Sequence, residues 1–555
     1  MPRFPLSSLA LLIGCCLVGG ISPGLQAEDA AWTWPEESRD AFGTDLDEAT
    51  VMRVTSLAAG GEGSLRAALE ADIEGPRLVV FEVGGVIDLE GRSMRIRNDR
   101  TWIAGQTAPT PGVTLIRGGL GIDASHVVVQ HLKIRPGDRG AGDGKKWEPD
   151  GITTLGANHD ILIEHCSVTW GVDENLSASS YGAPEGTHAR RITIRNCLIA
   201  EALNEATHAE GAHSKGTLVL DGTREVAIVG NLYAGNVERN PVFKPDTSGV
   251  IVNNVMAAIG ARAAHASLPP VDSPAEPARL AVIGNTALLG TGSKKSAGIF
   301  EGRADAYFRD NVGANRQGEA IPLLRDPFPS LDSAPVWPQG LLAQSATAAQ
   351  WRAVRFAGAR PAERDPIDAR IVAEAVSGSL RIIDSQEEVG GYPEPEETRH
   401  PDPLTVPESA RDAWLEAIAR EVEGRTLVRP TSERPRDLTR FAAATVHPLA
   451  TEAAIDAFDR GGNAIDAAIA AAVTLGVVDA HNSGIGGGCF ILIHAADGTL
   501  TAIDGREMAP AAATRDLYLV DGKADPELSR TGPQASGVPG ALAAWARSTR
   551  RQTRR

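Results

Sequence analysis

Six short apolar runs of one pattern recur along the middle of the sequence, and they constrain the fold more than any other feature. Each run alternates apolar residues with others and then reaches a His or an Asn, and the recurrence is every 23 to 35 residues. The six polar positions are His131, His165, Asn196, Asn231, Asn254 and Asn285. Period-2 strands repeating at this spacing, without helix-length apolar periodicity between them, predict stacked coils of strands.

A parallel β-helix fits this repeat better than a propeller does. A propeller unit needs about four strands and a more regular period, whereas a β-helix rung needs only about three short strands and tolerates long loops. Equivalent residues then stack rung upon rung, so we expect the Asn amides to hydrogen-bond along the stack. The alternative is that these Asn residues only form turns. Irregular loops on one side of such a solenoid predict a groove suited to a long polymer.

The loops of this repeat carry a dense set of ionisable side chains. They are Asp150, Glu164, His165, Asp173, Glu174, His213, Lys215, Arg239 and Lys244. With a rung of roughly 30 residues, we expect Glu164, Arg195 and either Val229 or Gly230 at equivalent positions on successive rungs. Clustered carboxylates favour a hard cation such as Ca²⁺, and neighbouring cations favour an anionic ligand. Together they predict a site for a carboxylated sugar bridged by a metal.

Each of these residues also has a purely structural interpretation. Asp150 precedes Gly151 and is a typical turn former, Glu164 is a strand residue that can face solvent, and His165 is better explained as a ladder member than as a ligand. Arg239 and Lys244, in the stretch NVERNPVFK, are either ordinary surface charges or one wall of an anion-binding cleft. The surrounding ionisable residues favour the cleft wall.

Several of these stretches resemble the pectate lyases of polysaccharide lyase family one. They are VTSLAAGGEGSLRAALE, DGITTLGANHDILIEHCSVTWGVDENLS, HSKGTLVLDG and ERNPVFK, within residues 41–420. The resemblance implies a mainly β chain folded as a right-handed parallel β-helix of the pectin lyase-like type. It also implies Ca²⁺-assisted β-elimination of polygalacturonate, an acidic pectate-like polysaccharide.

The resemblance also assigns roles to individual residues. Arg239 falls on the first Arg of the family's Arg-x-Pro-x-x-Arg motif, which implies that it abstracts the C5 proton. Lys215, preceded by His213 and Ser214, and Lys244 would bind the substrate, and His213 belongs to the same substrate-binding group. Glu164, Asp173 and Glu174 would be the metal ligands.

Three departures from the family pattern bear on calcium dependence and on substrate identity. Lys244 replaces an Arg and so offers a point charge instead of a planar fork. Glu164 replaces an Asp and is one methylene longer. Ser177 stands where an acidic ligand is expected, and Glu174 is the candidate to replace it.

The bulk composition limits the remaining possibilities. The 555 residues predict at least two units, and the net charge of −17 argues against a nucleic-acid partner. The first residues form a basic, then apolar segment that predicts a signal peptide over 1–27, hence a secreted or periplasmic protein, with lipoprotein processing at Cys15 as the alternative. No other segment is long and apolar enough to cross a membrane. Beyond the signal, Cys166, Cys197 and Cys489 are expected to be buried free thiols, and a monomer is expected.

The sequence changes character after about residue 395. We expect the β-helix over 28–394, a Pro-rich linker with one helix over 395–439, and a separate α/β segment over 440–555. That last segment, HPLATEAAIDAFDRGGNAIDAAIAAAVTLGVVDAHNSGIGGGCFILIHAADGTLTAIDGREMAP, resembles the start of γ-glutamyltransferases. The resemblance implies a fragment of an αββα N-terminal-nucleophile hydrolase in which Arg506 holds an α-carboxylate. Asn463 is a candidate helix N-cap.

Three functions are therefore compared. The first is a secreted polysaccharide lyase acting on pectate-like uronans. The second is a non-catalytic carbohydrate-binding β-helix. The third is part of a γ-glutamyltransferase (glutathione hydrolase), which we expect to be inactive because the family's Thr nucleophile lies further downstream.

Overall fold

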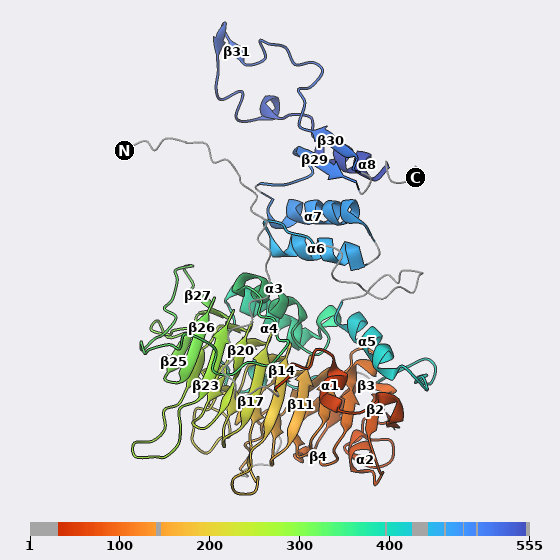
Figure 1. Cartoon of the computed structure of the whole chain (residues 1–555), viewed down its shortest axis with the longest axis vertical. Helices are drawn as coiled ribbons and strands as arrows, with labels where there is room; N and C mark the ends of the chain where they lie inside the picture. The colour runs from red at the N-terminus through yellow and green to blue at the C-terminus, as the bar shows by residue number, and fades with distance from the viewer. Residues whose placement is uncertain are drawn as a thin grey trace. The chain divides into compact units, whose positions relative to one another are not determined.

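The structure, a computed structural model, describes residues 32–139, 146–394, 397–424, 442–459, 462–480, 482–495 and 498–550. The expected signal peptide and Cys15 lie outside these residues. The chain divides into two compact units, Met1–Gly424 and Arg425–Arg555, and each is described by itself (Figure 1). No helix within the described ranges is both long enough and apolar enough to span a membrane.

The first unit is a parallel β-helix of three sheets, which confirms the predicted fold (Figure 1). Sheet 1 contains β1 (Thr50–Val54), β2 (Arg77–Phe81), β5 (Thr101–Ala104), β8 (Val127–Gln130), β11 (His159–Glu164), β14 (Arg190–Arg195), β17 (Arg224–Val229), β20 (Ser248–Val252), β23 (Arg279–Ile283) and β26 (Asp305–Arg309). Sheet 2 contains β4 (Met94–Ile96), β7 (Leu120–Ile122), β10 (Ile152–Thr154), β13 (Glu174–Ala178), β16 (Lys215–Val219), β19 (Val242–Phe243), β22 (Ala264–Ala266) and β25 (Phe300–Gly302). Sheet 3 contains β3 (Val83–Asp88), β6 (Val113–Ile116), β9 (Leu132–Arg135), β12 (Ser167–Thr169), β15 (Leu198–Ala200), β18 (Leu232–Ala234), β21 (Val255–Ala257), β24 (Thr286–Leu288) and β27 (Val312–Ala314), with β28 (Thr398–Arg399) antiparallel to β3.

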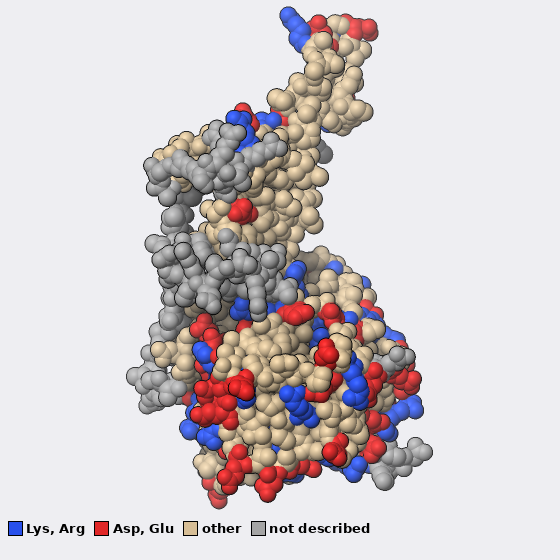
Figure 2. All heavy atoms as spheres, turned by 90° about the vertical axis from the view of Figure 1, so that its right-hand side faces the viewer, with Lys and Arg blue, Asp and Glu red and all other residues tan. Residues whose placement is uncertain are grey.

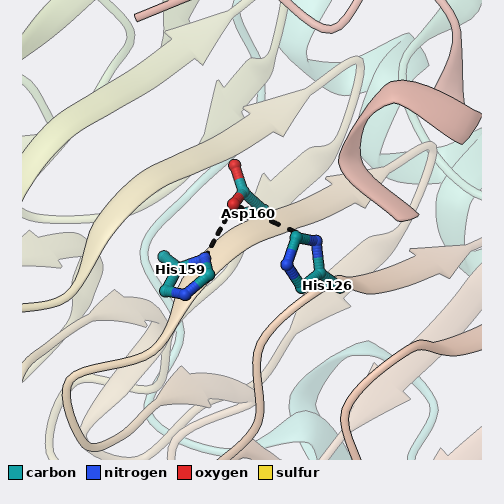
Figure 3. A group of neighbouring side chains, drawn as sticks. All are labelled: His126, His159 and Asp160. Atoms are coloured by element: carbon teal, nitrogen blue, oxygen red, sulfur yellow. Dashed lines mark hydrogen bonds and ion pairs between the residues drawn. The ribbon is translucent and has the colours of Figure 1, made fainter. Parts of the chain in front are cut away.

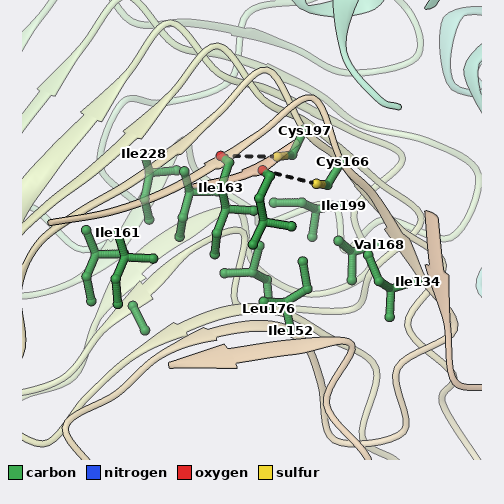
Figure 4. Close-up of a cluster of buried hydrophobic side chains, with 14 of the residues drawn as sticks. Ile134, Ile152, Ile161, Ile163, Cys166, Val168, Leu176, Cys197, Ile199 and Ile228 are labelled. Carbon is green, nitrogen blue, oxygen red and sulfur yellow. Dashed lines mark hydrogen bonds between the residues drawn. The ribbon is translucent and has the colours of Figure 1, made fainter. Parts of the chain in front are cut away.

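The chain visits sheet 2, sheet 1 and sheet 3 in turn and then returns to sheet 2. Apolar side chains from all three sheets fill the interior, where Ile161, Ile163 and Ile228 are fully or almost fully buried (Figure 4). Cys166 and Cys197 are buried free thiols, as predicted, and each Sγ lies 3.7 Å from a carbonyl oxygen of the preceding rung. Cys489 in the second unit is only partly buried, so the expectation of a buried thiol is wrong there.

The predicted polar ladder exists, but its members occupy two neighbouring columns. Asn231 Nδ2 donates to Asn254 Oδ1 over 2.9 Å, and Asn254 Nδ2 donates to Asn285 Oδ1 over 3.0 Å. The strand register places Cys166 and Cys197 in this column, one position after His165 and Asn196. His131 and His165 instead stack on each other in the adjacent column, with ring centroids 5.3 Å apart. The prediction of one six-membered ladder is therefore wrong in register.

Helices close the outside of the β-helix. α3 (Ala346–Phe356) and α4 (Pro366–Ser377) pack their apolar faces on residues of sheet 3. α1 (Ser38–Phe42) and α5 (Arg411–Val422) pack on sheet 1, and α2 (Leu65–Glu70) lies beside β1 and β4. α5 is the helix expected within 395–439, and its buried Leu415 anchors it to the first unit.

The second unit is a small α/β fragment. α6 (Pro448–Asp459) and α7 (Ala464–Val478) pack through small Ala side chains, and Asn463 caps α7 by accepting from the backbone nitrogens of Ile465 and Asp466, as predicted. β29 (Cys489–His494) and β30 (Leu500–Gly505) form an antiparallel pair, followed by β31 (Leu519–Val520), β32 (Lys523–Ala524) and α8 (Ala541–Arg550).

Candidate active site

One corner of the β-helix gathers charged side chains from four successive rungs. It is the corner where the chain leaves sheet 3 and enters sheet 2, and we call it the acidic corner. Glu174 begins β13 and is in register with Lys215, which begins β16. The backbone of Lys215 in turn forms an isolated parallel β-bridge with Glu238, the residue before Arg239. The stacking of rungs thus places Glu174, Lys215 and Glu238 in one column along the helix axis, with Arg239 next to Glu238 in the chain.

Three carboxylates of the acidic corner lie close together. The oxygens of Asp150, Asp173 and Glu174 are within 4.8 Å of one another. Burial, followed by the negative charge of Asp173, raises the pKa of Asp150 to about 7. Oxygen donors gathered this closely fit a hard divalent cation such as Ca²⁺, which would offset the repulsion between the carboxylates.

Arg239 faces this cluster. Its guanidinium contacts the Oε1 atom of Glu174, a carboxylate that is almost completely buried. Burial lowers the pKa of Arg239, while the charges of Asp173 and Asp150 oppose that shift. The backbone of Arg239 has φ of +60°, a left-handed conformation that is uncommon for a side-chain-bearing residue and is enriched at functional sites.

Two stacked histidines hold Asp173 from the other side. His213 Nε2 lies 2.9 Å from Asp173 Oδ1, and His208 Nε2 lies 3.6 Å from the same oxygen. The two imidazole rings stack with centroids 3.6 Å apart. Hydrogen bonding to His213 leads the effects that lower the pKa of Asp173 against the opposing effect of burial. His213 therefore contacts an expected metal ligand, and its role in binding substrate stays a prediction.

The two lysines differ in their surroundings. Lys215 Nζ pairs with Glu238 Oε1 and keeps only a small exposed fraction. Lys244 follows β19 and lines an open depression of about 580 Å³ together with Asp221, Arg224 and Asp246. Burial, followed by the nearby charge of Arg239, lowers the pKa of Lys244.

Glu164 does not join this group, so its expected place among the metal ligands is wrong. It ends β11 at the corner between sheets 1 and 3, whereas Asp173 and Glu174 lie at the corner between sheets 3 and 2. The register Glu164↔Arg195↔Val229 agrees with the expected equivalence of these residues. Arg195 Nε donates to Glu164 Oε1 over 2.6 Å, and Gln130 and Ser38 donate to the other oxygen over 2.8 Å each. This carboxylate is fully occupied by protein donors.

A second group with potential metal ligands lies on sheet 1 and is already satisfied. It consists of His126, His159 and Asp160, with His159 Nδ1 2.7 Å from Asp160 Oδ2 (Figure 3). Arg191 donates to both oxygens of Asp160 over 2.7 Å. Because the guanidinium already neutralises the carboxylate, this group acts as a structural ion-pair network.

The sequence placed Asp150 in the predicted cluster of ionisable residues but did not single it out as a metal ligand, and it did not point to His208 or Glu238. Asp150 lies about one rung before Glu174. His208 belongs to a long loop, 201–214, whose path no repeat predicts. Glu238 had a visible signal, since it immediately precedes Arg239. Arg506 lies in the second unit just after β30, largely exposed and 3.5 Å from Glu507 Oε2.

The fold and the site together define a structural class: a parallel β-helix that gathers a carboxylate cluster and an arginine at one corner. Comparison with known proteins adds the particular relatives. Over 195 residues the chain is 40% identical to the probable pectate lyase C of Emericella nidulans, covering 35% of this chain and 40% of that protein. The N-terminal part thus has pectate lyase homologues, and the chain spans about 40% of the length of this curated relative.

The second unit has different relatives. Residues 450–554 match the gamma-glutamyltranspeptidase family. Over 103 residues the chain is 47% identical to the glutathione hydrolase proenzyme of Escherichia coli, covering 18% of each protein. Among solved structures, the cedar pollen allergen jun a 1 aligns with 55% of this chain and 87% of its own length, at 16% identity and a TM-score of 0.38.

Proposed function

We propose that the first unit is a secreted lyase that cleaves a pectate-like polygalacturonate by β-elimination. The observation that carries this proposal is the row of Asp150, Asp173, Glu174 and Arg239 along one corner of the β-helix. The pectate lyase homologues support the same chemistry. On the face of the first unit that Figure 2 shows, acidic and basic side chains intermingle. Binding of a polyanion therefore depends on the local arrangement of these side chains rather than on the net charge of −17.

Asp150, Asp173 and Glu174 would hold the cation. Bound there, Ca²⁺ would neutralise the C6 carboxylate of the uronate and make the C5 proton more acidic. Arg239, whose charged form is disfavoured by burial, removes the C5 proton. The electron pair forms the C4–C5 double bond, the C4–O bond breaks, and the leaving oxygen takes a proton from solvent. His208 and His213 keep Asp173 oriented throughout.

The test is to incubate the whole chain with polygalacturonate and follow the ultraviolet absorbance of the unsaturated product, with added Ca²⁺ and with a chelator. We expect product with Ca²⁺ and little with the chelator. Binding of the polymer without any product would instead support the non-catalytic carbohydrate-binding function, and would contradict the lyase.

The second unit supports a separate proposal: by itself it carries out no γ-glutamyl transfer. Its β29–β30 pair exposes 72% of Phe490 and 69% of Leu492, an apolar face of the kind that a complete two-layer sheet covers. Arg506 is likewise largely open to solvent. Release of p-nitroaniline from γ-glutamyl-p-nitroanilide by the whole chain would contradict this proposal.

A further inference from the structure

Glu238 occupies the place where the acidic corner would otherwise meet a substrate carboxylate. Its backbone is fixed, because the nitrogen of Gly216 donates to the carbonyl oxygen of Glu238 over 3.0 Å and the nitrogen of Glu238 donates to Ser214 over 3.2 Å. Its side chain reaches Lys215 Nζ and lies 3.7 Å from Arg262. The carboxylate therefore stands among cations that a bound uronate would use.

Lys215 has little freedom to serve a second carboxylate. Only 11% of its side chain is exposed, and Glu238, 22% exposed, covers the ammonium group. Burial opposes ionisation of Glu238, but Lys215 outweighs it and lowers the pKa of Glu238, so this carboxylate is charged at neutral pH. A uronate carboxylate placed at Lys215 must displace Glu238 or lie beside a like charge, and either choice costs free energy.

A cation at the neighbouring carboxylate cluster does not remove this obstacle. Glu174 belongs to that cluster, but Glu238 does not. A metal bound by Glu174 can thus take the place of Arg239 as the partner of that carboxylate. Glu238 is not a member of the carboxylate cluster, so a metal bound there leaves the pair of Lys215 and Glu238 in place. A neutral sugar unit next to Lys215 meets no repulsion from Glu238.

We propose that Glu238 sets the substrate class of this site: it selects a uronan whose unit beside Lys215 is neutral, as in a methyl ester, over fully de-esterified polygalacturonate. This inference rests on the proposed lyase function. The preferred substrate is a partly methyl-esterified polygalacturonate, with a free carboxylate only at the unit that faces Asp150, Asp173 and Glu174.

The test compares kcat/KM on polygalacturonate and on a partly methyl-esterified pectin, for the wild type and for Glu238→Gln. The substitution removes the competing charge, so we expect the ratio of the two kcat/KM values to shift toward polygalacturonate by about tenfold, mainly through KM. Glu82→Gln is the matched control, since Glu82 is 19% exposed and pairs with Arg53 at the corner between sheets 1 and 3, away from Lys215 and Arg262. The control should leave the ratio unchanged.

A binding measurement separates the possible failures. In an Arg239→Ala background, calorimetry with de-esterified and methyl-esterified oligogalacturonides measures the same preference without turnover. A preference for the de-esterified ligand that Glu238→Gln does not alter would overturn the inference. Absence of unsaturated product from both polymers, with the ester preference intact in calorimetry, would overturn the lyase function and leave the role of Glu238 standing.

Discussion

Two corners of the same β-helix hold buried carboxylates in opposite conditions. At the corner between sheets 1 and 3, Glu164 accepts hydrogen bonds from Arg195, Gln130 and Ser38. Burial opposes ionisation there, but the charge of Arg195 leads the effects that hold the pKa of Glu164 below its ordinary value. At the acidic corner, Asp150 faces Asp173, and burial with that neighbour raises the pKa of Asp150 to about 7. The carboxylate of Glu164 has protein donors on both oxygens, whereas the repelled carboxylate of Asp150 belongs to the cluster at which we propose that a cation binds.

The largest expected effect on stability concerns the satisfied corner. Glu164→Gln leaves the buried Arg195 without its charged partner, and we expect a loss of about 3–5 kcal/mol in the free energy of unfolding. Denaturant unfolding measures it. Catalysis by the folded fraction should remain, because Glu164 is not at the acidic corner. Selective loss of lyase activity with unchanged stability would show that the two corners have been assigned the wrong way round.

Calcium should distinguish the acidic corner from the group of His126, His159 and Asp160 on sheet 1. At about 100 times its Kd, the ion should stabilise the native chain by about 2.7 kcal/mol. Asp173→Asn should abolish this stabilisation, seen as the loss of the calcium-dependent rise in Tm. Asp160→Asn, in the network already neutralised by Arg191, is the control and should retain it. Equal losses in both variants would argue against a specific site at the acidic corner.

The folded chain should become more stable when the negative charge of Asp150 is removed from the acidic corner. The pKa of Asp150 is raised in the folded state, so the protonated group contributes stability that is full below about pH 4 and is lost as the pH rises to about 7. Asp150→Asn avoids that loss. Without added metal, the variant should gain about 1–3 kcal/mol relative to the wild type between pH 5 and pH 8. A variant less stable than the wild type at pH 8 would show that Asp150 is not repelled.

The pH dependence of the rate follows from the residue proposed as base. The guanidinium must lose a proton before it can accept one, and burial helps only in part. We therefore expect kcat/KM on polygalacturonate to rise from neutral to alkaline pH. An optimum in acid, measured in buffers of constant ionic strength, is incompatible with Arg239 as the base.

The sequence predicted the coarse fold because a β-helix repeats its strands at readable intervals. It failed at single-residue register, since His165 and Asn196 look like members of the Asn231 column although they stand one position before it. For the same reason the sequence could not show at which corner of the rung Glu164 lies, and it was grouped with Asp173. The rung spacing did correctly align Glu164 with Arg195. The position of His208 depends on a loop that has no repeat partner, so only the three-dimensional structure brings it to Asp173.

The most direct test of the account compares two arginines that each pair with a carboxylate in this β-helix. Arg239 contacts Glu174 at the acidic corner, and Arg191 contacts Asp160 on sheet 1, with 19% and 25% of their side chains exposed. We predict that Arg239→Ala lowers the rate of unsaturated product formation from polygalacturonate by about a thousandfold or more, whereas Arg191→Ala changes the rate per folded molecule little. Product formation by Arg239→Ala at the wild-type rate would contradict the assignment of this corner as the active site.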